Sequence, residues 1–303
     1  MKGRRLVALA VSIAAAGLAF TACTPPPVGT TCKLPATAGT TAKTITVKGV
    51  SRSYLLSVPA GYTGTTRVPL VFDFHGLGSN DVEQAVYSQM SVQAGARGWI
   101  VVTPQGQAAG STNLWQLATT SPDVDFVAAL VTSVSSVLCV DSQRTFAAGI
   151  SNGAGFSGAL VCALPGRFAA IAPVAGLNLS KACSAATPHA SVIAFHGTAD
   201  PIVPYDGGLV FGALPVVSVS DAFSAWAAFD GCNAKRTLTK IAADVTRTDA
   251  QQCPTGIGVS LYTVDGGGHT WPGAPVDIPY GTTTQSIHAT QLILDFFAAH
   301  PRR

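Results

Sequence analysis

The chain has 303 residues, of which 48% are hydrophobic and only 11% are charged. Three of its 18 lysines and arginines lie within the first 22 residues, which leaves 15 basic and 15 acidic residues in the rest of the chain. Because no basic surplus, run or stripe remains, the composition argues against a nucleic-acid partner, and the low charge is typical of an exported domain.

The N-terminus has the pattern of an export signal. Basic residues at positions 2, 4 and 5 precede the apolar run 6–20, and small residues follow it. The run is too short for a membrane-spanning helix, so we interpret residues 1–22 as a signal peptide that is removed.

Cys23 ends the sequence Phe-Thr-Ala-Cys, which resembles a lipoprotein box with phenylalanine in place of the usual leucine. In such a box the cysteine becomes the lipidated first residue. We therefore expect an extracellular protein, anchored to the outer face of the cell membrane through Cys23, with simple secretion as the alternative. A lipid on Cys23 is the only contact with a membrane that we expect.

Residues 23–43 are rich in threonine, proline, glycine and alanine, which is typical of a tether. No internal repeat and no second linker follow. We therefore predict that residues 44–303 form a single catalytic domain, and we expect a monomer.

Extended runs alternate with helix-like runs from residue 44 onward. Strands are expected at residues 44–50, 53–58, 69–74, 99–103, 145–150, 169–174, 191–195 and 259–264. Helices are expected at residues 81–97, 123–138, 154–164, 221–230 and 285–300. This alternation predicts an α/β fold with a mostly parallel central sheet covered by helices on both faces. Chemistry then belongs at the carboxyl ends of the strands.

Six cysteines remain besides Cys23, and an even number in an exported chain indicates up to three disulfides. The spacing alone does not select a pairing. Our prediction is Cys162–Cys183, Cys232–Cys253 and Cys32–Cys139. No Cys-x-x-Cys or mixed Cys/His spacing is present, so a metal site is not expected.

Ser151 is the candidate nucleophile. It follows the strand expected at residues 145–150 and lies between Gly149 and Gly153, which fits the G-x-S-x-G nucleophile elbow. At such an elbow the backbone turns sharply, and a side chain two residues before or after the serine would collide with the turn. In a glycine-rich chain the motif alone also fits an ordinary turn, so partners are required.

The general base and its acid follow later strands. His269 lies in a glycine-rich loop after the last strand, which favours it as the base over the other histidines. Asp200 follows the strand at residues 191–195 and is the candidate acid that would accept a hydrogen bond from His269 Nδ1. Asp206 is the runner-up for this role.

A tetrahedral intermediate needs two backbone N–H donors. We assign the first to Asn152, directly after the nucleophile. The second is expected from the loop after the strand at residues 69–74, where we assign Leu77, with Gly76 as the next candidate. His75 in the same loop is a candidate for supporting the loop and for contacting the substrate.

The segments HGLGSN, GISNGAGFSG, FAAIAPVAG, AFHGTADPIVPYDGG and GGGHTWPG together resemble secreted carbohydrate esterases. These are feruloyl esterases and acetyl xylan esterases, which are grouped with polyhydroxybutyrate depolymerase-like esterases. The resemblance implies an α/β-hydrolase fold, a carboxylester hydrolase with Ser151, Asp200 and His269 as its catalytic residues, and no cofactor. Ala154 departs mildly from the pattern, which often has glycine there.

The implied substrate is a hydroxycinnamoyl or acetyl ester of a plant polysaccharide, or a hydroxyalkanoate ester. Trp271 and Trp115 lie in loops near the predicted site, so each is a candidate for substrate contact, with packing as the alternative. Two other functions remain open: a serine peptidase on the same fold, and a non-catalytic binding protein that keeps a hydrolase fold.

Overall fold

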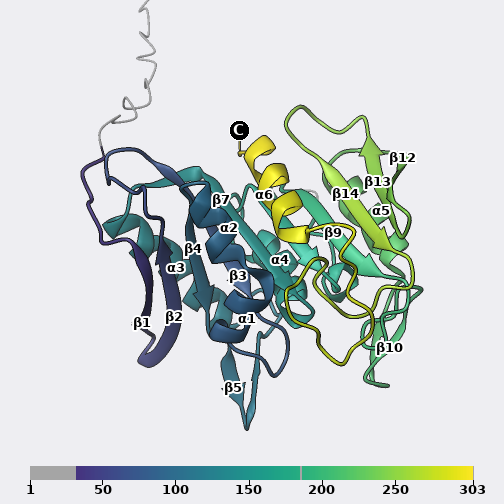
Figure 1. Cartoon of the computed structure of the whole chain (residues 1–303), viewed down its shortest axis with the longest axis horizontal. Helices are drawn as coiled ribbons and strands as arrows, with labels where there is room; N and C mark the ends of the chain where they lie inside the picture. The colour runs from purple at the N-terminus through teal and green to yellow at the C-terminus, as the bar shows by residue number, and fades with distance from the viewer. Residues whose placement is uncertain (1–31, 185, 303) are drawn as a thin grey trace, which may run out of the picture. The chain divides into compact units, whose positions relative to one another are not determined.

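The computed structural model describes residues 32–184 and 186–302 (Figure 1). The predicted signal peptide, Cys23 and the predicted tether up to residue 31 lie outside these residues. None of the helices in the described ranges is long and apolar enough to cross a membrane. The first strand begins at Gly39, so the end of the predicted tether belongs to the sheet.

A ten-stranded sheet forms the centre of the domain, in the order β1-β2-β4-β3-β7-β8-β9-β14-β13-β12. Neighbouring strands from β4 to β14 run parallel, and the strands at both edges pair antiparallel, which confirms the mostly parallel sheet. The strands are β1 (Gly39–Val47), β2 (Val50–Val58), β3 (Val68–Phe74), β4 (Ile100–Pro104), β7 (Val140–Ile150), β8 (Ala170–Val174), β9 (Ser191–Gly197), β12 (Asn233–Ala242), β13 (Val245–Gln251) and β14 (Val259–Val264).

Two small hairpins stand outside this sheet. They are β5 (Gln107–Ala109) with β6 (Thr112–Leu114), and β10 (Gly208–Val210) with β11 (Leu214–Val216). Figure 1 shows both hairpins at the same end of the domain, below the carboxyl ends of the parallel strands.

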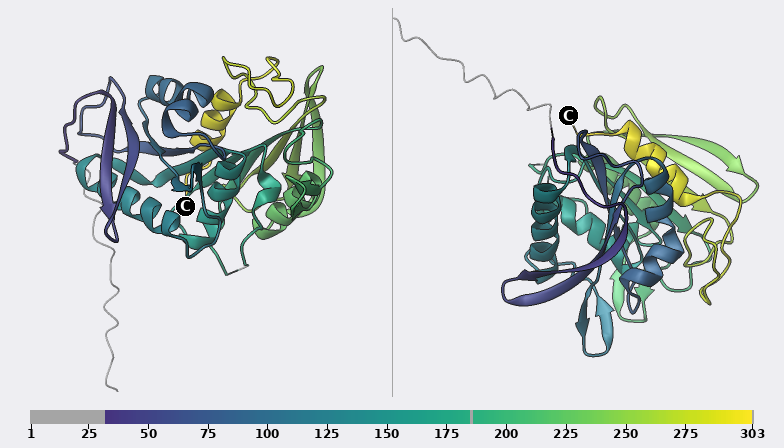
Figure 2. Two further views of the ribbon diagram at one scale, coloured as in Figure 1. Left: turned by 90° about the horizontal axis from the view of Figure 1, so that it is seen from below. Right: turned by 60° about the vertical axis from the view of Figure 1, so that its left-hand side comes forward.

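Helices cover both faces of the sheet, as Figure 2 shows in its end-on view. One face carries α1 (Asp81–Ser88), α2 (Met90–Ala96) and α6 (Ala289–Ala299), and the other carries α3 (Pro122–Val137), α4 (Asn152–Ala163) and α5 (Val219–Phe229). A short 3-10 helix, η1 (Leu177–Leu179), follows β8. Each face has its own apolar core, and burial of these side chains stabilises the fold.

The single helix predicted at residues 81–97 is wrong, because the chain breaks into α1 and α2 at Gln89. Gln89 has a left-handed backbone with φ of 54°. Beside it, the Ser88 hydroxyl donates to the buried carboxylate of Asp73 and accepts from the Met90 N–H. These bonds replace the helical ones at the break, and they tie the start of α2 to β3.

Three disulfides join the cysteines in the predicted pairs. Cys32–Cys139 closes the largest loop, with 107 residues of separation, and attaches the segment before β1 to the start of β7. Closing a loop of this length lowers the entropy of the unfolded chain more than closing the two 21-residue loops does.

Asp230, at the end of α5, is fully buried. Its Oδ1 accepts from the Ala190 N–H and lies 3.6 Å from His189 Nδ1, while Oδ2 has no hydrogen-bond partner among the described residues. Burial raises the pKa of this carboxyl from 3.8 to about 8, although the hydrogen bond from Ala190 acts in the opposite direction.

We predict that Asp230 makes stability fall as pH rises. Between pH 3.8 and about 8 the unfolded chain releases this proton and the folded chain keeps it, so unfolding becomes easier by about 1.4 kcal/mol per pH unit. Asp230→Asn has no proton to release, and its Tm should fall less than that of the wild type from pH 5 to pH 8. The exposed Asp206→Asn serves as control in thermal unfolding. Equal losses of Tm in all three proteins would contradict the prediction.

Candidate active site

Ser151 lies between the end of β7 and the start of α4, with φ of 56° and ψ of −121°. A non-glycine residue rarely adopts this backbone, and such strain is concentrated at functional sites. A Cβ at Gly149 would lie 2.6 Å from the Gly153 carbonyl, and a Cβ at Gly153 would lie 2.4 Å from the Phe74 carbonyl. The two glycines therefore let β7, α4 and the end of β3 meet at the serine.

The other two predicted catalytic residues lie at the same edge of the sheet. Asp200 follows β9, and His269 follows β14, the parallel neighbour of β9. His269 Nδ1 lies 2.8 Å from Asp200 Oδ2. Both residues are buried. Ser151 and His269 line one cavity, so the structure brings the three residues together.

The Asp200 carboxylate is held at both oxygens. Oδ1 accepts from the N–H groups of Ile202 and Val203, each at 2.8 Å. Oδ2 accepts from His269 and lies 3.2 Å from His196 Nε2. Burial raises the pKa of this carboxyl, but the hydrogen bonds from His196 and His269 outweigh burial and hold the pKa well below its usual range. Asp200 is therefore ionised and fixes the Nδ1–H tautomer of His269.

The loop that carries His269 is pinned to a later segment. The N–H of Gly268 donates to Thr282, and that of His269 donates to the carbonyl of Tyr280. A Cβ on Gly268 would lie 2.3 Å from the Tyr280 carbonyl, which explains the glycine at this position. The Tyr280 ring lies edge-on to the His269 ring, with centroids 6.3 Å apart.

The two proposed oxyanion donors flank Ser151. Asn152 is the first residue of α4, where N–H groups have no acceptor within the helix and the helix dipole favours negative charge. Leu77 lines the cavity and is about half exposed. Gly76, the alternative donor, lies beside the nucleophile, since a Cβ added at Gly76 would lie 3.5 Å from the Ser151 Cβ.

Trp115, Trp271 and His75 are at most 1% exposed and none lines the cavity. The two tryptophans therefore follow the packing alternative, and His75 supports its loop instead of contacting a substrate. The Trp115 indole donates to the His75 carbonyl, and the Trp271 indole donates to the Thr290 hydroxyl. Each indole thus bonds within the protein. His75 Nε2 accepts from the Gly106 N–H, and burial lowers the pKa of the His75 ring.

The cavity beside Ser151 has a volume of about 550 Å³, and most of its wall was missed by sequence reasoning. Its apolar side chains come mostly from α1 and from residues 276–280, with one each from the loop after β3 and the end of β7. They are Leu77, Val82, Val86, Tyr87, Ile150, Val276, Ile278 and Tyr280. Val276, Ile278 and Tyr280 alternate along their segment, and this pattern was the available signal. Within residues 32–184 and 186–302, no cluster of three or more histidine, cysteine or acidic side chains could hold a metal ion.

Residues 52–234 match the family model described as "Esterase PHB depolymerase". The chain is 30% identical over 231 residues to feruloyl esterase B of Piromyces equi, covering 72% of this chain but only 42% of that relative. It is 29% identical over 288 residues to the putative esterase NocK of Nocardia uniformis subsp. tsuyamanensis, and the match covers 86% of this chain and 83% of that relative.

Among solved structures, the acetyl xylan esterase from Aspergillus awamori superposes with a TM-score of 0.60 at 14% identity. The match covers 86% of this chain and 99% of that one. A likeness at this identity concerns the fold alone, and it supports the predicted α/β-hydrolase architecture.

Proposed function

Because the chain belongs to the Esterase PHB depolymerase family, we propose that it is a serine carboxylester hydrolase with Ser151 as its nucleophile. The observation that carries the proposal is the 2.8 Å contact from His269 Nδ1 to Asp200 Oδ2, on a histidine that shares a cavity with Ser151. A surface binding protein would need neither this pair nor a strained serine beside it.

The mechanism is a two-step acyl transfer. Ser151 Oγ attacks the ester carbonyl carbon as its proton passes to His269 Nε2, and Asp200 stabilises the imidazolium through Nδ1. The N–H groups of Leu77 and Asn152 donate to the resulting oxyanion. The C–O bond of the ester then breaks, and the alcohol leaves with the proton from His269. Water, deprotonated by His269, attacks the acyl-enzyme and releases the acid and the free serine.

We propose an aromatic acyl group of hydroxycinnamoyl size as the preferred substrate. An acetyl group would leave most of a cavity of about 550 Å³ empty, whereas an apolar wall with Tyr87 and Tyr280 suits a flat ring. Feruloyl esterase B, a relative at 30% identity, is named for such a substrate. The runner-up is a hydroxyalkanoate ester, which the family name suggests and which also fits an apolar wall.

The rates on methyl ferulate, p-nitrophenyl acetate and a hydroxybutyrate trimer test this choice. Val86→Trp should fill the cavity and lower kcat/KM for methyl ferulate by about 10-fold or more, while p-nitrophenyl acetate changes by less than about threefold. Val92 on α2 is similarly exposed but does not line the cavity, so Val92→Trp is the matched control. Equal losses on both esters would show that the cavity does not hold the acyl group, and preference for the trimer would favour the runner-up.

We also infer that the chain is exported, and the three disulfides support this because such bonds persist in oxidising compartments. Anchoring through a lipid on Cys23 rests on the sequence pattern. The mass of the N-terminal peptide of the mature protein would distinguish a lipidated Cys23 from a free N-terminus.

A further inference from the structure

The two oxyanion donors come from different parts of the fold. Leu77 lies in the loop after β3, and Asn152 begins α4. Both N–H groups must lie about 2.7–3.1 Å from one developing negative charge. Their spacing therefore depends on what links the two segments.

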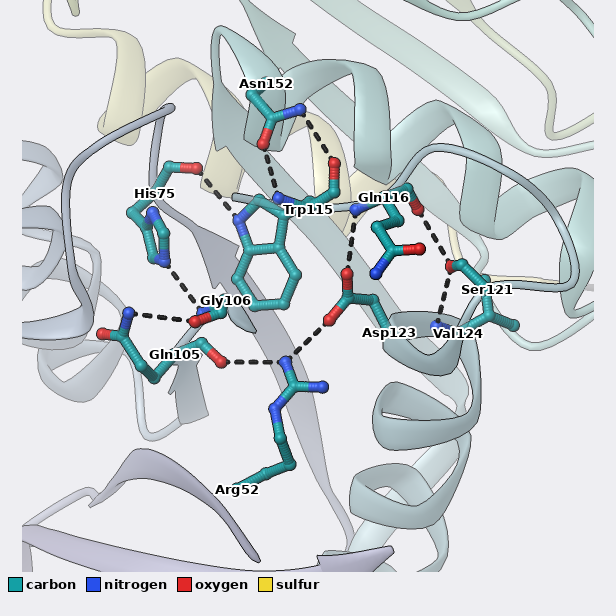
Figure 3. Close-up of polar contacts among 10 residues, drawn as sticks. All are labelled: Arg52, His75, Gln105, Gly106, Trp115, Gln116, Ser121, Asp123, Val124 and Asn152. Carbon is teal, nitrogen blue, oxygen red and sulfur yellow. Dashed lines mark hydrogen bonds and ion pairs between the residues drawn. The ribbon is translucent and has the colours of Figure 1, made fainter. Parts of the chain in front are cut away.

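Trp115 contacts both segments (Figure 3). Its backbone N–H donates to Asn152 Oδ1 at 2.6 Å, and its carbonyl accepts from Asn152 Nδ2 at 3.0 Å. Its indole N–H donates to the carbonyl of His75 at 3.0 Å. We call these three hydrogen bonds the Trp115 clamp. The clamp joins the residue before Gly76-Leu77 to the residue whose N–H is the other donor.

The His75 side chain in turn fixes the direction of the Leu77 N–H. Gly106 donates its N–H to His75 Nε2 at 2.9 Å, so Nε2 is an acceptor and the ring hydrogen is on Nδ1. Nδ1 therefore donates to the Gly76 carbonyl at 2.7 Å. In a trans peptide the Gly76 C=O and the Leu77 N–H point in opposite directions. Holding the carbonyl on His75 thus aims the Leu77 N–H away from that ring.

Besides its bonds to Asn152 and His75, Trp115 is held by its aromatic neighbours and by the residue that follows it. Its ring stacks on Phe156 of α4, with centroids 4.9 Å apart, and meets Phe74 of β3 edge-on at 5.2 Å. The next residue, Gln116, donates its N–H to Asp123, and Asp123 forms a buried ion pair with Arg52 at 2.7 Å (Figure 3). The tryptophan therefore serves as a fixed reference for both segments.

We propose that Trp115 is a positioning residue that holds the two oxyanion donors at the separation the tetrahedral intermediate requires. The proposal rests on the proposed function, and Trp115 acts through Asn152 and His75 without touching the substrate. Because both donors keep their backbone N–H groups in any Trp115 variant, the loss expected is smaller than the 10²–10³-fold that follows removal of a donor.

Trp115→Phe keeps an aromatic ring between Phe74 and Phe156 but removes the hydrogen bond to His75. With p-nitrophenyl acetate we expect kcat to fall about 10-fold and KM to stay within about twofold, because the lost interaction is made only in the transition state. The inhibition constant of a trifluoromethyl ketone, which forms an oxyanion on the serine, should rise by about the same factor. Asn152→Leu removes the two backbone bonds, keeps its own N–H, and should give the same pattern.

Trp226→Phe is the matched control, because Trp226 is equally buried in α5 and its indole nitrogen has no hydrogen-bond partner among the described residues. It should lower Tm without changing kcat. The inference is overturned if Trp115→Phe affects kcat no more than Trp226→Phe does, or if the loss is in KM. If Trp115→Phe does not fold, a wild-type kcat in folded Asn152→Leu overturns it instead. A wild-type protein that hydrolyses no ester would refute the proposed function rather than the clamp.

Discussion

Alanine at position 151 is expected to lower kcat for p-nitrophenyl acetate roughly a million-fold, to the level left by binding and the oxyanion donors. The substitution removes the oxygen that forms the acyl-enzyme bond and leaves the cavity, Asp200 and His269 in place. Alanine has the same Cβ as serine, so the strained backbone with φ of 56° is no harder to adopt. The variant should therefore fold with a Tm close to that of the wild type.

Ser157→Ala is the control for this variant. Ser157 lies on α4, the helix that follows Ser151. It is buried, does not line the cavity, and donates its hydroxyl to the Ala154 carbonyl. Its removal should change kcat by less than about twofold. Substantial turnover by folded Ser151→Ala, or an equal loss in both variants, would contradict the assignment of the nucleophile.

Asparagine at position 200 is expected to lower kcat by about 10⁴-fold, for a reason the geometry makes specific. The N–H groups of Ile202 and Val203 both donate to Oδ1, so the amide oxygen of asparagine must take that place. Its NH₂ group then faces His269 Nδ1. Because the NH₂ group donates, His269 Nδ1 must become an acceptor, and the ring hydrogen moves to Nε2. His269 can then no longer take the proton of Ser151.

Asp206→Asn tests the alternative acid on the same loop. Asp206 is exposed, and the structure places Asp200 rather than Asp206 on His269. We expect kcat to change by less than about twofold in Asp206→Asn. A larger loss in this variant than in Asp200→Asn would contradict the role given to Asp200. Proton NMR of the His269 ring would show directly whether Asp200→Asn moves the ring hydrogen.

The candidate catalytic residues could be nominated because each has a short signal in the sequence. A Cβ at Gly149 would collide with Gly153 inside the motif, and a Cβ at Gly153 would collide with the Phe74 carbonyl at the end of β3. Both glycines belong to the short motif around Ser151, so the sequence reveals them even though one of the collisions is with a distant strand. Asp200 and His269 follow continuous apolar strands, and parallel strands end at one edge of a sheet. The G-x-S-x-G motif and the strand order were therefore sufficient to nominate them.

Loop support by His75 was predicted, but the partners of Trp115 and His75 were not predictable, because they lie far away in the chain. A tryptophan in a polar loop has the same sequence whether it contacts a substrate or donates to a carbonyl 40 residues earlier. The cavity wall likewise combines α1 with residues 276–280, which approach only in the folded chain.

The hairpin of β12 and β13 was missed for a different reason. Most β12 side chains are exposed, so the strand lacks the apolar alternation that marks a half-buried strand. Its place at the edge of the sheet is set by backbone pairing with β13, which a hydrophobic pattern does not reveal. Edge strands of this kind carry little sequence signal.

The most direct test of the central claim is the mass of the intact protein after treatment with a fluorophosphonate, followed by peptide mapping. Such a reagent forms a covalent bond with a serine only where a base activates the hydroxyl and an oxyanion site receives the phosphoryl oxygen. We predict one adduct per chain, located on Ser151, and none on Ser151→Ala. An unlabelled wild-type protein, or a Ser151→Ala variant labelled as fast as the wild type, would contradict the account.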